Sequence, residues 1–220
     1  MDFSSILQTW IAAVSNPNEE FYEAERTKPE ATINTAVIWV LIATVIAAVL
    51  GALRTIIGIN AMGGMEQLLS QMDMPPEMTQ QMTQMLSGGA GAGLAIGSLL
   101  FSLILTPIFF LIGVGIFYLV ARMLGGQGDY GRYAYLISTF YAPLTVVSSV
   151  LGFVPLLGGC AGLIIVIYQV VLTYFATKVE HRLTSGKAIA VALTPIIIFG
   201  VFFVCIAGFA GAFILSNANG

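Results

Sequence analysis

The chain has 220 residues, of which 58% are hydrophobic and only 9% are charged, and its mean hydropathy is +0.93. A soluble domain of this size carries roughly 25% charged residues, so a soluble surface would have to be built from apolar side chains. The composition excludes an ordinary soluble domain and predicts an integral membrane protein, for which lipid is the main solvent. The net charge of −3 comes without a polybasic stretch, which argues against nucleic acid as a partner.

Residues 1–32 form a separate N-terminal segment that we expect on the cytoplasmic side. Its first part has the apolar spacing of one helical face, which Asn16-Pro17 ends. We expect this amphipathic helix to lie in the membrane interface with Trp10 at headgroup level; packing against the cytoplasmic end of the bundle is the alternative. The acidic stretch 18–30 follows as a short surface helix. The residues of the apolar face are Phe3, Ile6, Leu7, Trp10, Ile11 and Val14.

Five apolar runs are long enough to cross a bilayer, which takes about 20 residues of helix. No Asp, Glu, Lys or Arg falls within the body of any run. The predicted fold class is therefore all-α, a polytopic membrane protein with a five-helix transmembrane bundle over residues 33–215. The predicted spans are 33–53, 93–121, 134–154, 160–177 and 188–214.

Segment 54–92 is the only long loop between the spans. Its apolar residues predict two short amphipathic helices that are separated by Pro75-Pro76 and lie against the outer surface of the membrane. The glycine-rich stretch 87–93 predicts a flexible connection to the second span. Seven of the nine methionines fall within 62–85, and thioether ligands favour Cu(I). Because these methionines form the apolar stripe of the two helices and no His or Cys accompanies them, we favour a stripe buried by lipid or by the bundle surface and expect no metal site.

Gly126, Gly128 and Gly131 have the G-x-G-x-x-G spacing of a dinucleotide-binding loop. Such a loop needs a preceding β-strand, a following helix and an acidic residue about 20 positions on. Here a transmembrane span precedes the glycines, another follows within a few residues, and the acidic residue is missing. We therefore expect a tight reversal at the cytoplasmic face and no nucleotide.

The sequence offers little for catalysis. The single histidine, His181, lies beside Glu180 in the last cytoplasmic loop, where we expect it to be solvated. Cys160 and Cys205 lie inside apolar runs and are expected to be small buried hydrophobes. No paired carboxylates, serine–lysine dyad or metal-ligand cluster can be assembled within a span. We therefore expect no enzyme activity, no catalytic residue, no cofactor and no metal.

Uncharged polar residues do occur within the spans, and interhelical hydrogen bonding explains most of them. Gln169, near mid-membrane in the fourth span, is expected to face the bundle interior and is the first candidate for a larger role. Two glycine pairs, Gly93 with Gly97 and Gly158 with Gly162, have the spacing that lets helices approach closely. The polar residues in question are Ser98, Ser102, Thr106, Ser138, Thr139, Tyr141, Thr145, Ser148, Ser149, Gln169, Thr173 and Thr194.

The charges between the spans predict the orientation. Seven of the eight basic residues fall on one side of the predicted bundle, and only Arg54 falls on the other. Positive residues stay cytoplasmic, so the N-terminus is expected inside and the C-terminus outside. The seven residues are Arg26, Lys28, Arg122, Arg132, Lys178, Arg182 and Lys187.

Together these features resemble the Yip family, the Ypt/Rab-interacting membrane proteins, in their compact prokaryotic form. Five spans with a cytoplasmic N-terminus match that family, as does the pattern of Trp10, Asn16-Pro17 and Phe21 ahead of the first span. The stretch "YLVARMLGGQGDYGRYAYLISTFYAPL", 118–144, looks like the family's second-span exit, glycine-rich turn and third span with an alanine-proline pair. The eukaryotic aspartate-leucine-tyrosine-glycine-proline signature is missing, so we do not carry over Rab binding.

The resemblance, the surface helices and the lack of charge within the spans favour a non-enzymatic protein of the prokaryotic cytoplasmic membrane. It would act as a scaffold, a membrane-organising protein or an accessory subunit, with membrane lipids and other membrane proteins as partners. The alternative is a transporter or channel for a neutral or lipidic solute, which would use the polar third and fourth spans. A continuous polar face leading to a cavity near Gln169 would favour that alternative.

Overall fold

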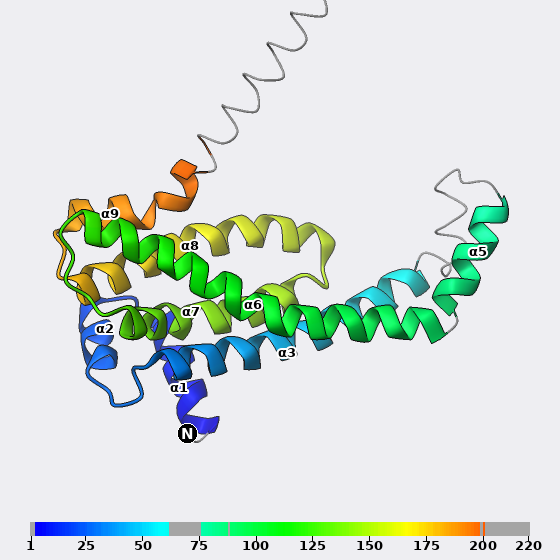
Figure 1. Ribbon diagram of the computed structural model, residues 1–220, viewed down its shortest axis with the longest axis horizontal. Coiled ribbons are helices and arrows are strands. Elements are labelled where there is room, and N and C mark those ends of the chain that lie inside the picture. Colours follow the sequence, from blue (N-terminus) through cyan, green and yellow to red (C-terminus); the bar gives the residue numbers. More distant parts are fainter. Residues whose placement is uncertain (1–2, 62–75, 88, 199, 201–220) are drawn as a thin grey trace, which may run out of the picture.

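The computed structural model describes residues 3–61, 76–87, 89–198 and 200, and all of its regular elements in these ranges are α-helices (Figure 1). The helices are α1 (Phe3–Ser15), α2 (Glu19–Arg26), α3 (Ile33–Ala61), α5 (Pro76–Ser87), α6 (Gly89–Met123), α7 (Tyr130–Leu151), α8 (Pro155–His181) and α9 (Ser185–Ala192). The all-α fold class expected from the apolar runs is thereby confirmed.

Four of the described helices, α3, α6, α7 and α8, are long and apolar enough to cross a membrane. They correspond to the first four predicted spans. Helices α3, α6 and α8 extend beyond the predicted limits, whereas α7 begins before residue 134 and ends at Leu151, short of the predicted end at 154. The fifth predicted span, 188–214, falls largely outside the described residues. Its first part belongs to α9, which ends at Ala192, with Leu193 as its C-cap before the helix resumes.

Side-chain caps explain where two of the helices begin. Asn18 precedes α2 and accepts a hydrogen bond from the Phe21 N–H at 2.8 Å, while Asp129 precedes α7 and accepts one from the Arg132 N–H at 2.9 Å. Both residue types are favoured at N-caps because their short side chains satisfy a helix donor that has no partner in the helix.

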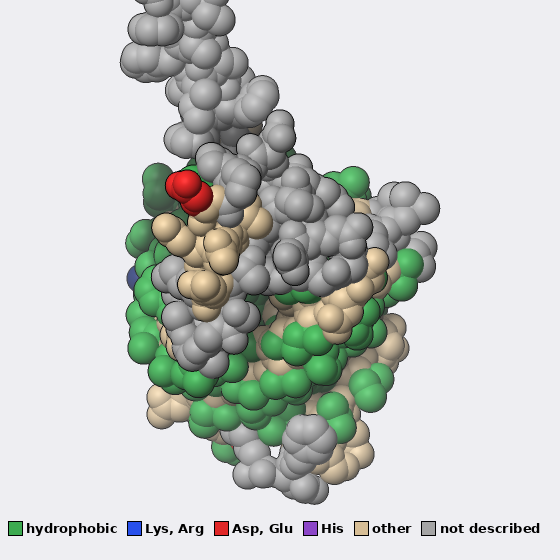
Figure 2. All heavy atoms as spheres, turned by 90° about the vertical axis from the view of Figure 1, so that its right-hand side faces the viewer, with side chains coloured by type: hydrophobic (Ala, Val, Ile, Leu, Met, Phe, Trp, Pro, Cys, Tyr) green, Lys and Arg blue, Asp and Glu red, His purple; other side chains and the backbone are tan. Residues whose placement is uncertain are grey.

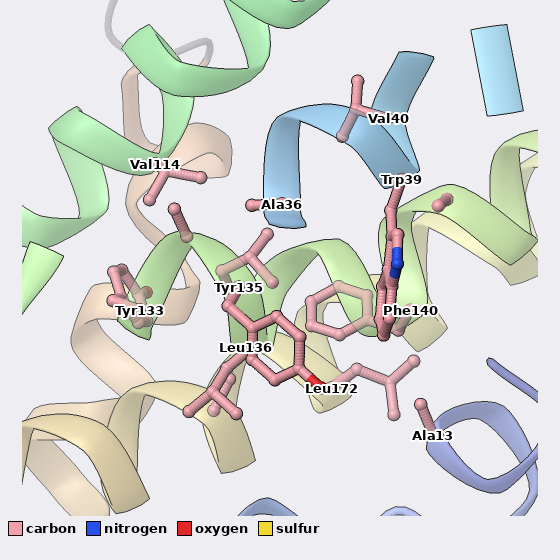
Figure 3. Close-up of a cluster of buried hydrophobic side chains, with 14 of the residues drawn as sticks. Ala13, Ala36, Trp39, Val40, Val114, Tyr133, Tyr135, Leu136, Phe140 and Leu172 are labelled. Atoms are coloured by element: carbon pink, nitrogen blue, oxygen red, sulfur yellow. The ribbon is translucent and has the colours of Figure 1, made fainter. Parts of the chain in front are cut away.

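The membrane-spanning helices lie side by side, with α7 the most buried of them. The core forms where α7 packs against α3, α8 and α1 (Figures 1 and 3). Trp39, Tyr135, Phe140 and Leu172 meet there, and each is nearly or completely inaccessible to solvent. In contrast α6 lies at the edge of the bundle, and its exposed residues recur every three or four positions, as expected for a lipid-facing helix. They include Ile96, Leu100, Ile104, Ile108, Ile112, Ile116 and Leu119.

The predicted outer loop 54–92 is shorter than expected. Because residues 55–61 contain no helix-breaking proline, α3 continues through them to Ala61. The second predicted amphipathic helix is present as α5, whereas the first lies outside the described residues. The stretch 87–93, expected to be flexible, largely belongs to α6, which begins at Gly89.

The N-terminal helix α1 runs across the direction of α3 (Figure 1) and packs on α7. Its inner face is formed by Ile6, Trp10 and Ala13, all buried. Trp10 makes an edge contact with Trp39, with ring centroids 6.2 Å apart. The face that contains Trp10 therefore packs on the bundle, which was the alternative to a face turned toward lipid, and the depth of Trp10 relative to the headgroups stays a prediction. Leu7 and Ile11, the other part of the predicted apolar face, remain exposed.

Candidate functional site

Seven of the eight basic side chains gather at one end of the bundle, where α2, the turn 124–129 and the connection between α8 and α9 meet. We call this region the charged end. Most of its charged side chains form ion pairs with one another, and many of these pairs connect residues that are far apart in the sequence. The remaining basic side chain, Arg54, lies at the opposite end and donates from Nη1 to the Gly152 carbonyl at 3.4 Å.

Glu180, in the last turn of α8, is the centre of the charged end. Its side chain is completely buried, and it accepts hydrogen bonds from Arg26 Nε at 3.3 Å, Arg132 Nε at 3.2 Å and the Asp129 N–H at 2.7 Å. A buried carboxylate is strongly destabilising unless it is paired and hydrogen-bonded. Glu180 is paired with two arginines and also accepts a backbone hydrogen bond. These contacts connect α2, the turn before α7 and α7 itself to α8.

A second buried carboxylate, Glu25 of α2, lies close by. It accepts from Lys28 Nζ at 2.6 Å and from the Tyr135 hydroxyl of α7 at 2.8 Å. Because Tyr135 is itself almost completely buried, this bond fixes α2 to the buried face of α7.

Exposed ion pairs surround these two buried groups. Glu23 accepts from Arg182 Nη2 at 2.7 Å and from Arg26 Nη1 at 3.1 Å, and Lys178 bonds to Glu19. Partial burial acts to raise the pKa of Glu23, but the hydrogen bonds from Arg182 and Arg26 outweigh it and lower that pKa below its ordinary value. Arg182 has a left-handed backbone conformation, φ 54°, where α8 ends, and its side chain reaches α2 from there.

His181 is buried rather than solvated, which corrects the expectation from its neighbours in the sequence. Its ring lies against Tyr133 and Tyr118, with centroids 4.7 and 5.4 Å away. Its Nδ1 accepts from the Gly128 N–H at 3.3 Å, and its Nε2 has no hydrogen-bond partner among the described residues. The histidine therefore serves as the surface on which the glycine turn packs.

The glycine turn is tight because it lies directly on the end of α8. A Cβ atom at Gly126 would come within 2.9 Å of His181 Nδ1, and one at Gly128 within 2.9 Å of the Glu180 carbonyl oxygen. Real Cβ atoms do not approach other atoms so closely, so both positions require glycine. The sequence spacing thus reflects packing of the turn on α8.

The backbone of the same turn argues against a phosphate site. Each backbone N–H group from Gly125 to Asp129 donates a hydrogen bond to another group of the protein. The acceptors in chain order are the Arg122 carbonyl, the Ala121 carbonyl, the His181 carbonyl, His181 Nδ1 and Glu180 Oε1. A dinucleotide-binding loop works because such N–H groups point at the ligand, and these do not. These hydrogen bonds support the reversal that was predicted from the lack of a preceding strand pattern in the sequence.

Within the spans, the Ser and Thr hydroxyls that were expected to join helices bond mostly to their own helix. Thr145, Ser149 and Thr173, for example, donate to the carbonyl four residues earlier, because a short side chain reaches that carbonyl most easily. The longer tyrosine side chains make the bonds between helices. Tyr133 pairs with Thr177 at 2.7 Å, Tyr130 donates to the Leu111 carbonyl at 2.8 Å, and Tyr168 donates to the Val14 carbonyl.

Gln169 is half-buried in α8, and its orientation toward the bundle interior stays a prediction. Among the described residues, a Cβ atom at Gly93, Gly97 or Gly162 would meet nothing within 4 Å, so no close helix approach is seen at these three glycines. The surroundings of Gly158 lie outside what the structure describes. In the part of the chain that the structure describes, no three His, Cys, Asp or Glu residues are grouped as metal ligands. The Met-rich segment 62–85 lies mostly outside that part.

The long apolar helices and the one charged end define a polytopic α-helical membrane protein. The Yip1 domain family model matches residues 11–206, and the chain therefore belongs to the Yip1 domain family. Searches of curated proteins and of solved structures return no match. The resemblance read from the glycine turn and the surrounding spans is thereby confirmed at the level of the family.

Proposed function

We propose that this protein is a non-enzymatic scaffold, membrane-organising protein or accessory subunit of a membrane complex, with its charged end in the cytoplasm. The observation that carries the proposal is the construction of that end. Buried Glu25 and Glu180 fix the N-terminal helices onto α7 and α8, so that they form a preorganised platform. A rigid surface of this kind loses little conformational entropy when a partner binds.

The chemistry of the described residues supports this proposal. The ionisable groups of the charged end are mostly engaged with one another, and the N–H groups of the glycine turn are all used. Reactive groups poised for catalysis would instead be directed into a cleft within reach of a substrate. Thr145, Ser149 and Thr173 bond to their own helices and so form no polar path through the described parts of α7 and α8.

The orientation is supported by the physical clustering of the basic residues. Arg26, Arg132 and Lys178 all engage groups of the charged end, whereas Arg54 is alone among basic residues at the opposite end. Basic residues favour the cytoplasmic side of a membrane. The proposal therefore has the N-terminus inside and the C-terminus outside, in a prokaryotic cytoplasmic membrane.

Transport of a neutral or lipidic solute is the second candidate, because the opposite end contains a cleft of about 700 Å³ between α3 and the α7–α8 connection. Arg54, Ser148 and Phe153 are among its lining residues. The volume lies within the range of small-molecule sites. This cleft, rather than the region near Gln169, is where a solute would be expected to enter.

Site-specific photo-crosslinking in native membranes tests the proposal. A photoreactive amino acid at Glu20, exposed on α2, is expected to give discrete protein adducts identifiable by mass spectrometry. The matched control is the same amino acid at Ile56, exposed at the opposite end of α3. If the Glu20 position yields no discrete adduct while the purified protein in vesicles shows saturable solute flux, the transport candidate replaces the scaffold.

A second arm checks the orientation. Single cysteines replacing Glu20 and Met78, in a chain with Cys160 and Cys205 changed to alanine, are treated with a membrane-impermeant thiol reagent on intact cells. Labelling is expected at position 78 only. Labelling at position 20 only would reverse the proposed orientation.

A further inference from the structure

A small cleft lies beneath α1, on the side of the bundle near the charged end. Its volume is about 400 Å³, within the range of small-molecule sites. One wall comes from α1, another from the connection between α2 and α3, and the aromatic floor from α3 and α7. The principal lining residues are Ile6, Thr9, Lys28, Glu30, Trp39 and Tyr135.

The floor of the cleft is aromatic and contains an unsatisfied donor. The rings of Trp39 and Tyr135 are 5.2 Å apart (Figure 3). Trp39 is only 3% exposed, and its indole N–H has no hydrogen-bond partner among the described residues; the neighbouring Trp10 indole N–H also lacks one. A buried donor without an acceptor costs about 1–3 kcal/mol. A ligand with acceptor oxygens next to this floor would remove that cost after a small movement of α1.

The charge balance of the cleft is negative. Lys28 is the one basic residue among its principal lining residues, and it is already paired with Glu25, which also takes the Tyr135 hydroxyl. Glu30 has no ion pair among the described residues, and it lines the same cleft as Tyr135. An ammonium group suits this setting, because it is attracted by a carboxylate and also by aromatic rings.

The position of α1 indicates where the ligand comes from. This helix runs across the spans (Figure 1), as a helix in the plane of the interface does, and Leu7 and Ile11 are exposed on it. Exposed apolar side chains on an interfacial helix contact acyl chains. The cleft beneath α1 therefore opens at the depth of lipid headgroups.

We propose that this cleft binds the headgroup of an amino phospholipid, of the phosphoethanolamine type. The ammonium group lies beside Glu30, the phosphodiester oxygens lie toward Lys28 and the Trp39 indole N–H, and the acyl chains follow the exposed face of α1. This inference goes beyond the proposed scaffold role, and the crosslinks from Glu20 do not depend on it.

The two tryptophans of the chain, Trp10 and Trp39, provide the measurement, because both lie at or beside this cleft. Detergent-solubilised protein is titrated with phosphatidylethanolamine, phosphatidylcholine or phosphatidylglycerol that carry the same acyl chains, and tryptophan emission is recorded. We expect a saturable change with phosphatidylethanolamine at a mole fraction at least several-fold lower than with the other two lipids. Equal responses to the three lipids, or a preference for phosphatidylglycerol, would overturn the proposal.

Variants assign the effect to the cleft. Glu30→Gln is expected to weaken binding about fivefold, the upper range for an exposed ion pair. The matched control Glu20→Gln removes an exposed carboxylate of α2 away from the cleft and is expected to leave binding unchanged. Unaltered binding in Glu30→Gln would contradict the proposal, and since Glu30 is exposed, both variants are expected to fold.

A soluble competitor separates the two sources of the same headgroup chemistry. Glycerophosphoethanolamine, which carries the headgroup without acyl chains, is added to the lipid-bound protein. Reversal of the emission change at millimolar concentration means that the headgroup alone suffices. A persistent lipid signal means that the acyl chains along α1 are needed as well. The persistent signal is the expected result, and reversal by the headgroup alone would overturn the placement of the acyl chains along α1.

Discussion

The two ends of the bundle are held together in different ways. At the charged end, buried Glu180 and Glu25 join helices that are 48 to 154 residues apart in the sequence. At the opposite end Arg54 donates to the Gly152 carbonyl, and among the atoms that Figure 2 does not draw in grey the face is mostly apolar or uncharged, with one acidic group. Specific polar contacts therefore define one end, and apolar surface suited to lipid dominates the other.

This difference indicates which parts of the protein tolerate change. Apolar packing against lipid is non-directional, so it permits small shifts of the helices. A buried ionic network has one favourable geometry, because loss of any member leaves a buried polar group unsatisfied. We therefore expect substitutions at the charged end to be much more destabilising than substitutions of similar size at the opposite end.

The largest effect is expected for Glu180→Gln. The change removes the negative charge that compensates Arg26 and Arg132, and it is expected to lower the free energy of unfolding by about 3 kcal/mol. Thermal unfolding in detergent, followed by tryptophan fluorescence, measures it. Glu20→Gln, on the exposed face of α2, is the control and should change stability by less than about 0.5 kcal/mol. Similar stabilities for the two variants would remove the proposed contrast between buried and exposed carboxylates.

Gly128→Ala tests the packing of the turn on α8. The added methyl group would come within 2.9 Å of the Glu180 carbonyl oxygen, and overpacking of this kind costs about 2 kcal/mol. Gly115→Ala, where a Cβ meets nothing within 4 Å of it, is expected to be neutral or slightly stabilising because alanine favours helix. Both are measured by the same unfolding assay. If Gly128→Ala proves as stable as Gly115→Ala, the close approach of the turn to α8 is wrong.

Tyr133→Phe sharpens the comparison between bonds that join helices and bonds within one helix. It removes the buried hydroxyl that pairs with Thr177 and is expected to cost about 1 kcal/mol. Ser149→Ala removes a hydroxyl that bonds only to its own helix, at the Thr145 carbonyl, and should cost less than about 0.5 kcal/mol. A larger loss for Ser149→Ala than for Tyr133→Phe would contradict the assignment of the tyrosines as the connecting groups.

The smallest effect concerns pH. Because the pKa of Glu23 is lowered in the folded protein, its carboxylate contributes stability that is fully present above its ordinary pKa of about 4.3 and is lost as the pH falls through the lowered value. Wild type should exceed Glu23→Gln by about 0.5 kcal/mol at pH 7, after allowance for solvent screening. Unfolding temperatures of the two proteins between pH 7 and pH 3 should converge at the acidic end. A constant difference across this range would show that the charge is not responsible.

The sequence predicted the first four spans well because long apolar runs leave few alternatives to a helix in lipid. It also predicted the reversal at Gly126 and Gly128, since no strand precedes them. The core of the charged end was not predictable in the same way. Glu180 and His181 look like solvated residues at the end of a span, and nothing local shows that Arg26, 154 positions earlier, will pair with this carboxylate. The one signal for burial was the pair of glycines, whose missing side chains leave room for the end of α8.

The connection between α2 and α8 also has a consequence for how the protein is made. Arg26 leaves the ribosome 154 residues before Glu180, which at about 5–20 residues per second corresponds to roughly 8–30 s of synthesis. Throughout that interval the spans are being inserted while α2 still lacks its partner on α8. The N-terminal helices can dock completely only after α8 has been inserted, so the first segment synthesised is among the last to reach its final position.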